Sequence, residues 1–172
     1  MLKVLEQKYF DEIYALMAKS FSANEFRSKL EQKALLKNPK YRIYGVTEDS
    51  VNIKAFVSVY DLGEFAFIEH FAVSPKYRNL GLGSLLLTKL KSTLKCRICL
   101  EVELPENELA KRRIRFYIRN GFFLNEYEYI QPPISRDKQS VPLLLMSSDA
   151  PLSHEEFENV KKILYREVYK HK

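Results

Sequence analysis

The stretch from Ile68 to Leu94 constrains the fold more than any other part of this 172-residue sequence. It opens with an apolar run, Ile68 to Val73, which predicts a strand. It closes with a leucine-rich segment, Gly83 to Leu94, whose leucines recur on one face and predict a helix. A short turn with two glycines joins the two elements, so the chain must pass directly from a strand into a helix.

The turn before this helix has the composition of an anion-binding loop. The first N–H groups of a helix have no partner inside it, and the helix dipole makes that end positive. Gly81 and Gly83 have no Cβ, so the backbone can approach an anion closely, and Arg78 adds a positive charge beside them. We predict that phosphate binds at Arg78, Asn79, Leu80, Gly81, Leu82, Gly83 and Ser84.

The remaining patterns predict a mixed α and β fold. Alternating or apolar segments predict strands at residues 1–7, 41–47, 51–60, 65–73, 97–104, 122–130 and 141–147. Helical spacing predicts helices at residues 9–21, 24–38, 83–94, 107–120 and 155–169. Asn24 is expected to cap the second helix, and Ser153 with Glu156 to form a capping box at the last. Short turns favour an antiparallel meander for residues 41–73, and the helix at 83–94 favours a right-handed crossover to a parallel strand.

Composition is that of one globular domain, with 46% hydrophobic and 29% charged residues. No apolar run approaches the roughly 20 residues that span a bilayer, and the N-terminus lacks a signal-peptide pattern, so a cytoplasmic location is the default expectation. The net charge of +6 is spread along the chain. Cys96 and Cys99 have no second Cys/His pair to complete a zinc site, so no metal is expected.

The glycine loop also carries a resemblance. The pattern Arg-x-x-Gly-x-Gly, between a strand that ends in AVSPKYR and a helix, resembles the acetyl-CoA pyrophosphate loop of the GNAT superfamily of N-acetyltransferases. A second segment, Arg113 to Phe122, resembles the superfamily's penultimate-helix signature, in which an aromatic–Tyr pair precedes Asn-Gly-Phe. The resemblance runs from near residue 1 to about Ser147. We therefore expect residues 1–172 to form one domain, in which a C-terminal helix at about 153–170 is added to the common core of the superfamily.

The resemblance implies an α/β (α+β) fold: a mixed, mostly antiparallel sheet with a splayed strand pair and helices on both faces. It implies acetyl-CoA as the cofactor and an N-acetyltransferase activity toward a primary amine, on a small molecule or a peptide. The pantetheine arm is expected along the backbone of Phe71, Ala72 and Val73, with Phe116 also at the cofactor.

The resemblance also implies catalytic roles. Tyr117 matches the tyrosine that protonates the leaving thiolate in many members, and its ordinary pKa near 10 keeps it protonated at neutral pH. For the base we rank Glu69 first, Glu101 second and His70 third. One departure stands in the same helix: many members place Asn and Ala seven and four residues before the tyrosine, where this chain has Ala110 and Arg113. A direct Asn contact to the cofactor is therefore not expected from that position.

Other classes fit less well. A Rossmann domain begins with its glycine loop, whereas three predicted strands precede this one, and neither a Walker A nor a G-x-S-x-G motif is present. The main alternative is a non-catalytic GNAT-fold module that binds CoA or a protein. Binding to nucleic acid or to a membrane is not expected. The sequence leaves the acceptor open, and it is compatible with a homodimer through the final strands or the last helix.

Overall fold

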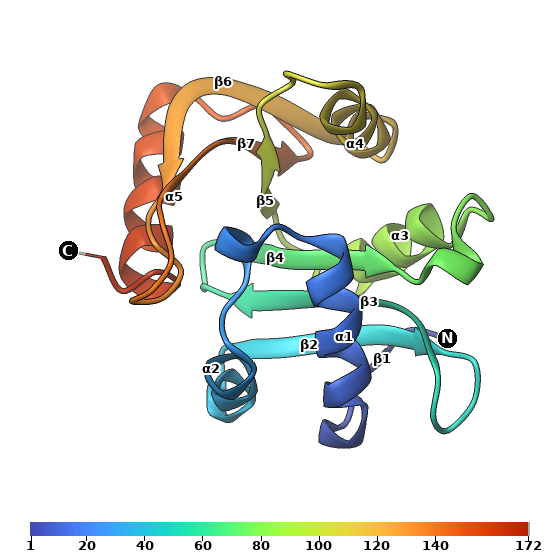
Figure 1. The fold of residues 1–172 in the computed structure, drawn as a ribbon. Helices are drawn as coiled ribbons and strands as arrows, with labels where there is room; N and C mark the ends of the chain where they lie inside the picture. Colours follow the sequence, from blue (N-terminus) through green and yellow to red (C-terminus); the bar gives the residue numbers. More distant parts are fainter. Residues whose placement is uncertain (172) are drawn as a thin grey trace.

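The computed structural model describes residues 1–171 and contains one seven-stranded sheet with the order β1-β2-β3-β4-β5-β7-β6. The strands span Lys3–Val4 (β1), Tyr41–Thr47 (β2), Ile53–Asp61 (β3), Ala66–Val73 (β4), Ile98–Glu103 (β5), Phe122–Gln131 (β6) and Val141–Ser148 (β7). The helices span Phe10–Ser20 (α1), Lys29–Ala34 (α2), Leu82–Leu94 (α3), Glu108–Arg119 (α4) and His154–Glu167 (α5). The predicted mixed fold with helices on both sheet faces is confirmed (Figure 1).

All strand pairs are antiparallel except β4 with β5. The predicted meander is formed by β2, β3 and β4, and the predicted parallel crossover leads from β4 through α3 to β5. The parallel pairing is short, because only Ala66, Phe67 and Ile68 pair with β5. Beyond these residues the two strands separate, and Figure 1 shows β4 and β5 running apart.

The sheet separates two apolar clusters. Helices α1 and α5 pack on one face, where their side chains join Phe56, Phe67 and Leu145. Helices α3 and α4 pack on the other face, where Leu86, Leu87, Leu90 and Ile114 join the strand side chains. Alternation along β5 explains the division, because Cys99 points to the first cluster and its neighbours Ile98 and Leu100 to the second. For brevity these are called the α1/α5 face and the α3/α4 face.

One predicted helix start is wrong. Asn24 does not cap a helix that runs to Asn38. A short 3-10 turn covers Ala23–Glu25, and α2 begins later, capped by Ser28, whose hydroxyl accepts from the Glu31 N–H. By contrast, Ser153 caps α5 and forms the predicted capping box with Glu156. No helix among residues 1–171 is long and apolar enough to cross a membrane.

Candidate active site

The separation of β4 from β5 leaves one edge of β4 open. Phe71, Ala72 and Val73 pair with β3 on one side, at Val57, Phe56 and Ala55. On the other side the β5 pairing has already ended at Ile68. Along this antiparallel ladder alternate residues turn their N–H and C=O groups toward β3, and the residues between them turn theirs toward the space between the diverging strands. An extended, amide-containing ligand can add hydrogen bonds to those outward-facing groups.

The open edge leads directly into the glycine loop. Gly81 is the N-cap of α3 with φ of +76°, in the left-handed region that favours glycine, and Asn79 also has a positive φ of +61°. The first backbone hydrogen bond of the helix runs from the Leu85 N–H to the Gly81 carbonyl. The N–H groups of Leu82, Gly83 and Ser84 consequently have no acceptor inside α3, as an anion-binding helix start requires.

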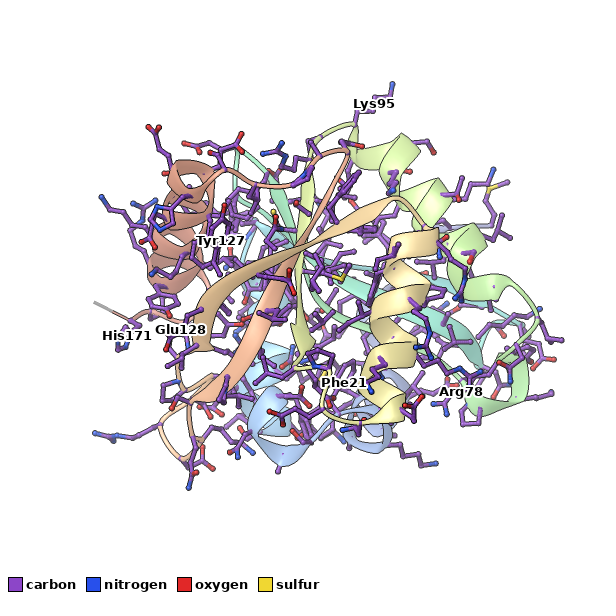
Figure 2. The ribbon with its side chains drawn as sticks, turned by 90° about the horizontal axis from the view of Figure 1, so that it is seen from above. Phe21, Arg78, Lys95, Tyr127, Glu128 and His171 are labelled. Atoms are coloured by element: carbon purple, nitrogen blue, oxygen red, sulfur yellow. The ribbon has the colours of Figure 1, made fainter. Side chains whose placement is uncertain are left out.

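Side chains around the loop hold its shape. The Nε of Arg78 donates to the Val73 carbonyl over 2.9 Å, which ties the guanidinium to the end of β4. Arg112 of α4 donates to the Asn79 side-chain oxygen over 3.0 Å and joins the loop to that helix. The Leu80 side chain is exposed. Figure 2 shows Arg78 at the loop before α3, on the opposite side of the molecule from His171 near the chain end.

An aromatic cluster lies beside the loop on the α3/α4 face. Phe116 stacks on Phe71 with ring centroids 6.1 Å apart, and Tyr117 lies 6.4 Å from Phe71. A Cβ added at Gly83 would lie 3.1 Å from the Phe116 ring and 3.6 Å from that of Phe71. The small residue at position 83 therefore allows α3, α4 and the open edge of β4 to meet closely.

Tyr117 is held by contacts of its ring and not by a hydrogen bond of its hydroxyl. The ring contacts Phe71, Phe116 and Phe122, and no described group accepts a hydrogen bond from the hydroxyl. Burial raises the pKa of Tyr117 well above its ordinary value, and the nearby charge of Arg113 opposes this only in part. The phenol therefore keeps its proton at neutral pH.

Glu69 and His70 lie on the other face, beside the α1–α2 segment. A bulge in the β3–β4 pairing lets both contact that segment although they are consecutive. Arg27 Nη2 lies 2.9 Å from Glu69 Oε1, with both side chains almost fully buried, and His70 Nε2 lies 2.6 Å from the Glu25 carbonyl oxygen. Burial alone would raise the pKa of Glu69, but the guanidinium of Arg27, helped by His70, outweighs it and holds the pKa well below its ordinary value.

Glu101 is in a different environment on the same face. The Tyr169 hydroxyl donates to Oε1, whereas the buried Oε2 has no hydrogen-bond partner among the described residues. The Tyr129 hydroxyl faces the same carboxyl without a hydrogen-bonding geometry. Burial raises the pKa of Glu101 to about 7, and the two tyrosines reduce that effect. Unlike Glu69, this carboxyl changes protonation near neutral pH.

The structure thus brings the predicted loop, the open edge and Tyr117 together on one side, and Glu69, His70 and Glu101 on the other. Sequence reasoning missed Arg27, Tyr129 and Tyr169, which lie far from their partners along the chain. No local pattern marks them. It also left Arg113 unexplained; this residue pairs with Glu103 of β5 over 2.7 Å and anchors α4 beside the site.

Comparisons with known proteins agree with this geometry. The model of the acetyltransferase (GNAT) family matches residues 10–122. A solved structure from Bacteroides thetaiotaomicron, of a protein assigned to the acetyltransferases of the GNAT family, is 31% identical, with a TM-score of 0.90 and a match covering 100% of this chain and 99% of that one. A search of curated proteins found no match.

Two more distant structures share the fold. The ribosomal-protein-S18-alanine N-acetyltransferase from Escherichia coli is 21% identical, with a TM-score of 0.66 and coverage of 90% of this chain and 96% of that one. The spermidine/spermine N-acetyltransferase from Vibrio cholerae is 15% identical, with a TM-score of 0.61 and coverage of 93% and 95%. Together with the family match, these findings identify the chain: it belongs to the GNAT family of acetyltransferases, which are acyltransferase enzymes.

Proposed function

We propose that this protein transfers an acetyl group from acetyl-CoA to a primary amine, by direct attack of the amine on the thioester. One observation carries the proposal: the open edge of β4, Phe71 to Val73, leads straight into a helix start whose first N–H groups have no acceptor within the helix. The GNAT family generally uses acetyl-CoA, and these two features match the two polar parts of that molecule.

The residues present fit acetyl-CoA in three respects. The N–H groups of Leu82, Gly83 and Ser84 suit a pyrophosphate, and the exposed Arg78 adds positive charge beside them. The backbone edge of β4 suits the two amides of the pantetheine arm. Gly83 lets the rings of Phe116 and Phe71 pack against the start of α3, which keeps the anion site next to the open edge of β4. When bound, acetyl-CoA supplies the acyl thioester; the protein orients it and moves protons.

Tyr117 is the proposed general acid. Its hydroxyl has no hydrogen-bond partner among the described groups and is protonated at neutral pH, so it can give a proton to the departing sulfur. The neighbouring rings of Phe71, Phe116 and Phe122 fix the direction of the phenol.

Glu101 is the proposed base, in preference to Glu69. An effective base has a pKa near the working pH, and Glu101 with a pKa of about 7 meets that condition. Glu69 instead forms an ion pair with the buried Arg27. This pairing holds the pKa of Glu69 low, and Glu69 is therefore a weak proton acceptor. Since Glu101 lies on the α1/α5 face and Tyr117 packs on the α3/α4 face, the two would act on opposite sides of the reacting centre.

The acceptor is proposed to be a cationic primary amine. Glu101 brings a carboxyl group to the face from which the amine would approach, and, unlike Glu69 with its Arg27 partner, it has no described cation beside it, so it can attract an ammonium. The names of the distant neighbours refer to spermidine or spermine and to an alanine of ribosomal protein S18. A first panel is therefore spermidine, a peptide with N-terminal alanine, a lysine-containing peptide and an aminoglycoside.

The test measures release of the CoA thiol from acetyl-CoA with each amine in the panel. Tyr117→Phe should lower kcat by about 100-fold, because general-acid catalysis typically contributes about 10²–10⁴-fold. Tyr44→Phe, which removes a hydroxyl from a half-buried tyrosine of β2 at the fringe of the same apolar cluster, is the control and should keep full activity. Full activity of Tyr117→Phe would rule out the acid role. Absence of amine-dependent thiol release across a broad amine panel would contradict the transfer reaction.

A further inference from the structure

The segment that follows α5 places two side chains inside the protein. After α5 ends at Glu167, Val168 and Tyr169 are buried, with 4% and 7% of their surface exposed. The Tyr169 N–H donates to the Leu164 carbonyl over 3.2 Å, and the backbone at Lys170 takes a positive φ of +53° that turns the chain back. These backbone constraints fix the position of the Tyr169 side chain.

The Tyr169 side chain reaches the proposed base. Its hydroxyl donates to Glu101 Oε1, from a position 68 residues away in the sequence. The second oxygen, Oε2, is buried and has no hydrogen-bond partner in the described part of the chain. A buried, unpaired carboxyl oxygen is costly unless a ligand or an ordered water completes it. Tyr169 thus occupies one oxygen of Glu101 and leaves the other for an incoming proton donor.

We infer that Tyr169 is a positioning residue of the active site: through its hydrogen bond to Oε1, the C-terminal segment holds Glu101 with Oε2 directed at the acceptor amine. The inference rests on the proposed function, because it gives the proton acceptor of that reaction a support. In the reaction, the amine nitrogen forms a bond to the acetyl carbon and the carbon–sulfur bond breaks. Glu101 takes one proton from the ammonium before the attack, and Tyr117 gives a proton to the sulfur. The second proton that the nitrogen loses as the amide forms passes to solvent, from which Tyr117 regains its own.

Other groups also act on Glu101. Glu69 of β4 and Glu25 of the turn before α2 raise its pKa by repulsion, after the larger effect of burial. Tyr129 of β6 and Tyr169 lower it, and Tyr165 of α5 lies near enough for the Glu101 charge to affect its own pKa. A hydroxyl that donates to a carboxylate stabilises the charged form. Loss of the Tyr169 hydroxyl should therefore raise the pKa of Glu101.

The experiment compares Tyr169→Phe with Tyr165→Phe in the full-length protein. Tyr165 is the matched control, because it lies in the same C-terminal region but donates to the Ile130 carbonyl instead of to Glu101. Glutamate labelled with ¹³C at the carboxyl is titrated by NMR without ligand, and Glu101→Gln identifies the Glu101 signal. In Tyr169→Phe the midpoint should move to higher pH by about one pH unit, as expected for one lost hydrogen bond to a charged group. In Tyr165→Phe it should stay in place.

The same variants are then assayed for acetyl transfer to the best amine of the panel. The acidic limb of the kcat/KM profile should move to higher pH in Tyr169→Phe by the same amount as the NMR midpoint. An unchanged Glu101 titration in Tyr169→Phe would overturn the inference, as would a moved titration with an unmoved limb. If the wild-type protein acetylates no amine, the proposed function fails, and with it the catalytic part of the inference, while the NMR titration still decides whether Tyr169 supports Glu101.

Discussion

Gly81 adopts a backbone conformation that other residues reach only with strain. Its φ is +76°, and a Cβ added there would meet no atom within 4 Å, so the strain is purely local. Gly63, in the turn between β3 and β4, has φ of +83° and equally open surroundings. The two glycines therefore form a matched pair, one at the proposed pyrophosphate loop and one remote from it.

We predict that Gly81→Ala and Gly63→Ala each lower the free energy of unfolding by about 1–2 kcal/mol, the usual cost of a left-handed backbone with a Cβ. Only Gly81→Ala should also weaken acetyl-CoA binding, measured by calorimetry, because only its loop is proposed to hold the phosphates. Equal acetyl-CoA affinity in the two variants would show that the Gly81 turn is not part of the binding site.

Glu101 should make the free energy of unfolding fall as pH rises toward neutral, the opposite of what a carboxyl with a lowered pKa does. Its pKa is about 7 in the folded protein and near 4.3 in the unfolded chain. Between these values unfolding releases a proton, so this residue makes the protein less stable as pH rises, and the loss levels off above about pH 7.

Glu101→Gln removes this titration. The melting temperature of the variant relative to wild type should rise steadily from about pH 4.5 to pH 7 and then become constant. Thermal unfolding at a series of pH values measures the difference. A pH-independent difference would mean that Glu101 has an ordinary pKa, and would weaken its assignment as the base.

At the scale of elements, the α1–α2 segment is attached to β4 through a buried ion pair. Arg27 and Glu69 side chains are 7% and 2% exposed, and their closest charged atoms are 2.9 Å apart. Removing one partner of such a pair leaves an uncompensated charge in the interior. The exposed pair of Lys29 with Asp11 on the same segment provides a comparison, because water surrounds both of its members.

Arg27→Met should lower the free energy of unfolding by about 3–5 kcal/mol at pH 7, and adding Glu69→Gln should restore much of the loss. Lys29→Met should change stability little. The Arg27→Met deficit should shrink as pH falls from 7 to 4, because without Arg27 burial raises the pKa of Glu69 and the buried carboxyl takes up a proton. Below about pH 4.3 the wild-type pair also loses its ionic stabilisation, because its Glu69 pKa is depressed. Urea denaturation at pH 7 and pH 4 tests this. A small deficit at pH 7, or no recovery in the double variant, would argue against the buried pair.

The positions of helices and strands were more predictable from the sequence than the contacts between residues far apart in it. Local patterns located α3, α5 and the strands from β2 onward closely, because apolar spacing and caps act over a few residues. The first strand, expected at residues 1–7, spans only Lys3–Val4. The start of α2 was misjudged although the sequence held a signal: two S-x-x-E boxes, Ser22 with Glu25 and Ser28 with Glu31, surround the position where Asn24 was expected to cap. Asn24 instead accepts from the Gln139 N–H, a contact 115 residues away that no local pattern reveals.

The candidate site shows the same division. The glycine loop and Tyr117 lie in contiguous motifs, and a resemblance could therefore propose their roles. The preference between Glu69 and Glu101 depends on Arg27 and Tyr169, which only the folded chain brings to them. Their environments shift the two pKa values in opposite directions, and composition or spacing along a strand carries no information about that.

In the whole molecule, the divergence of β4 from β5 separates two sides of the protein, which meet along the open edge of β4. Helices α3 and α4 bring the loop, Phe116 and Tyr117 to one face, and the α1–α2 and C-terminal segments bring charged and phenolic groups to the other. A thioester held along the open edge of β4 would thus meet an acid on one side and a base on the other. We propose that acetyl-CoA binds along this open edge.

The most direct test is the thermal unfolding midpoint with and without acetyl-CoA, with NAD and ATP as controls. A ligand at about 100 times its dissociation constant stabilises the folded state by roughly 2.7 kcal/mol, which for a domain of this size raises the midpoint by several degrees. We expect the unfolding midpoint to rise clearly with acetyl-CoA and to stay unchanged with NAD or ATP at equal concentration. An unchanged midpoint at millimolar acetyl-CoA, or equal rises with all three nucleotides, would contradict it.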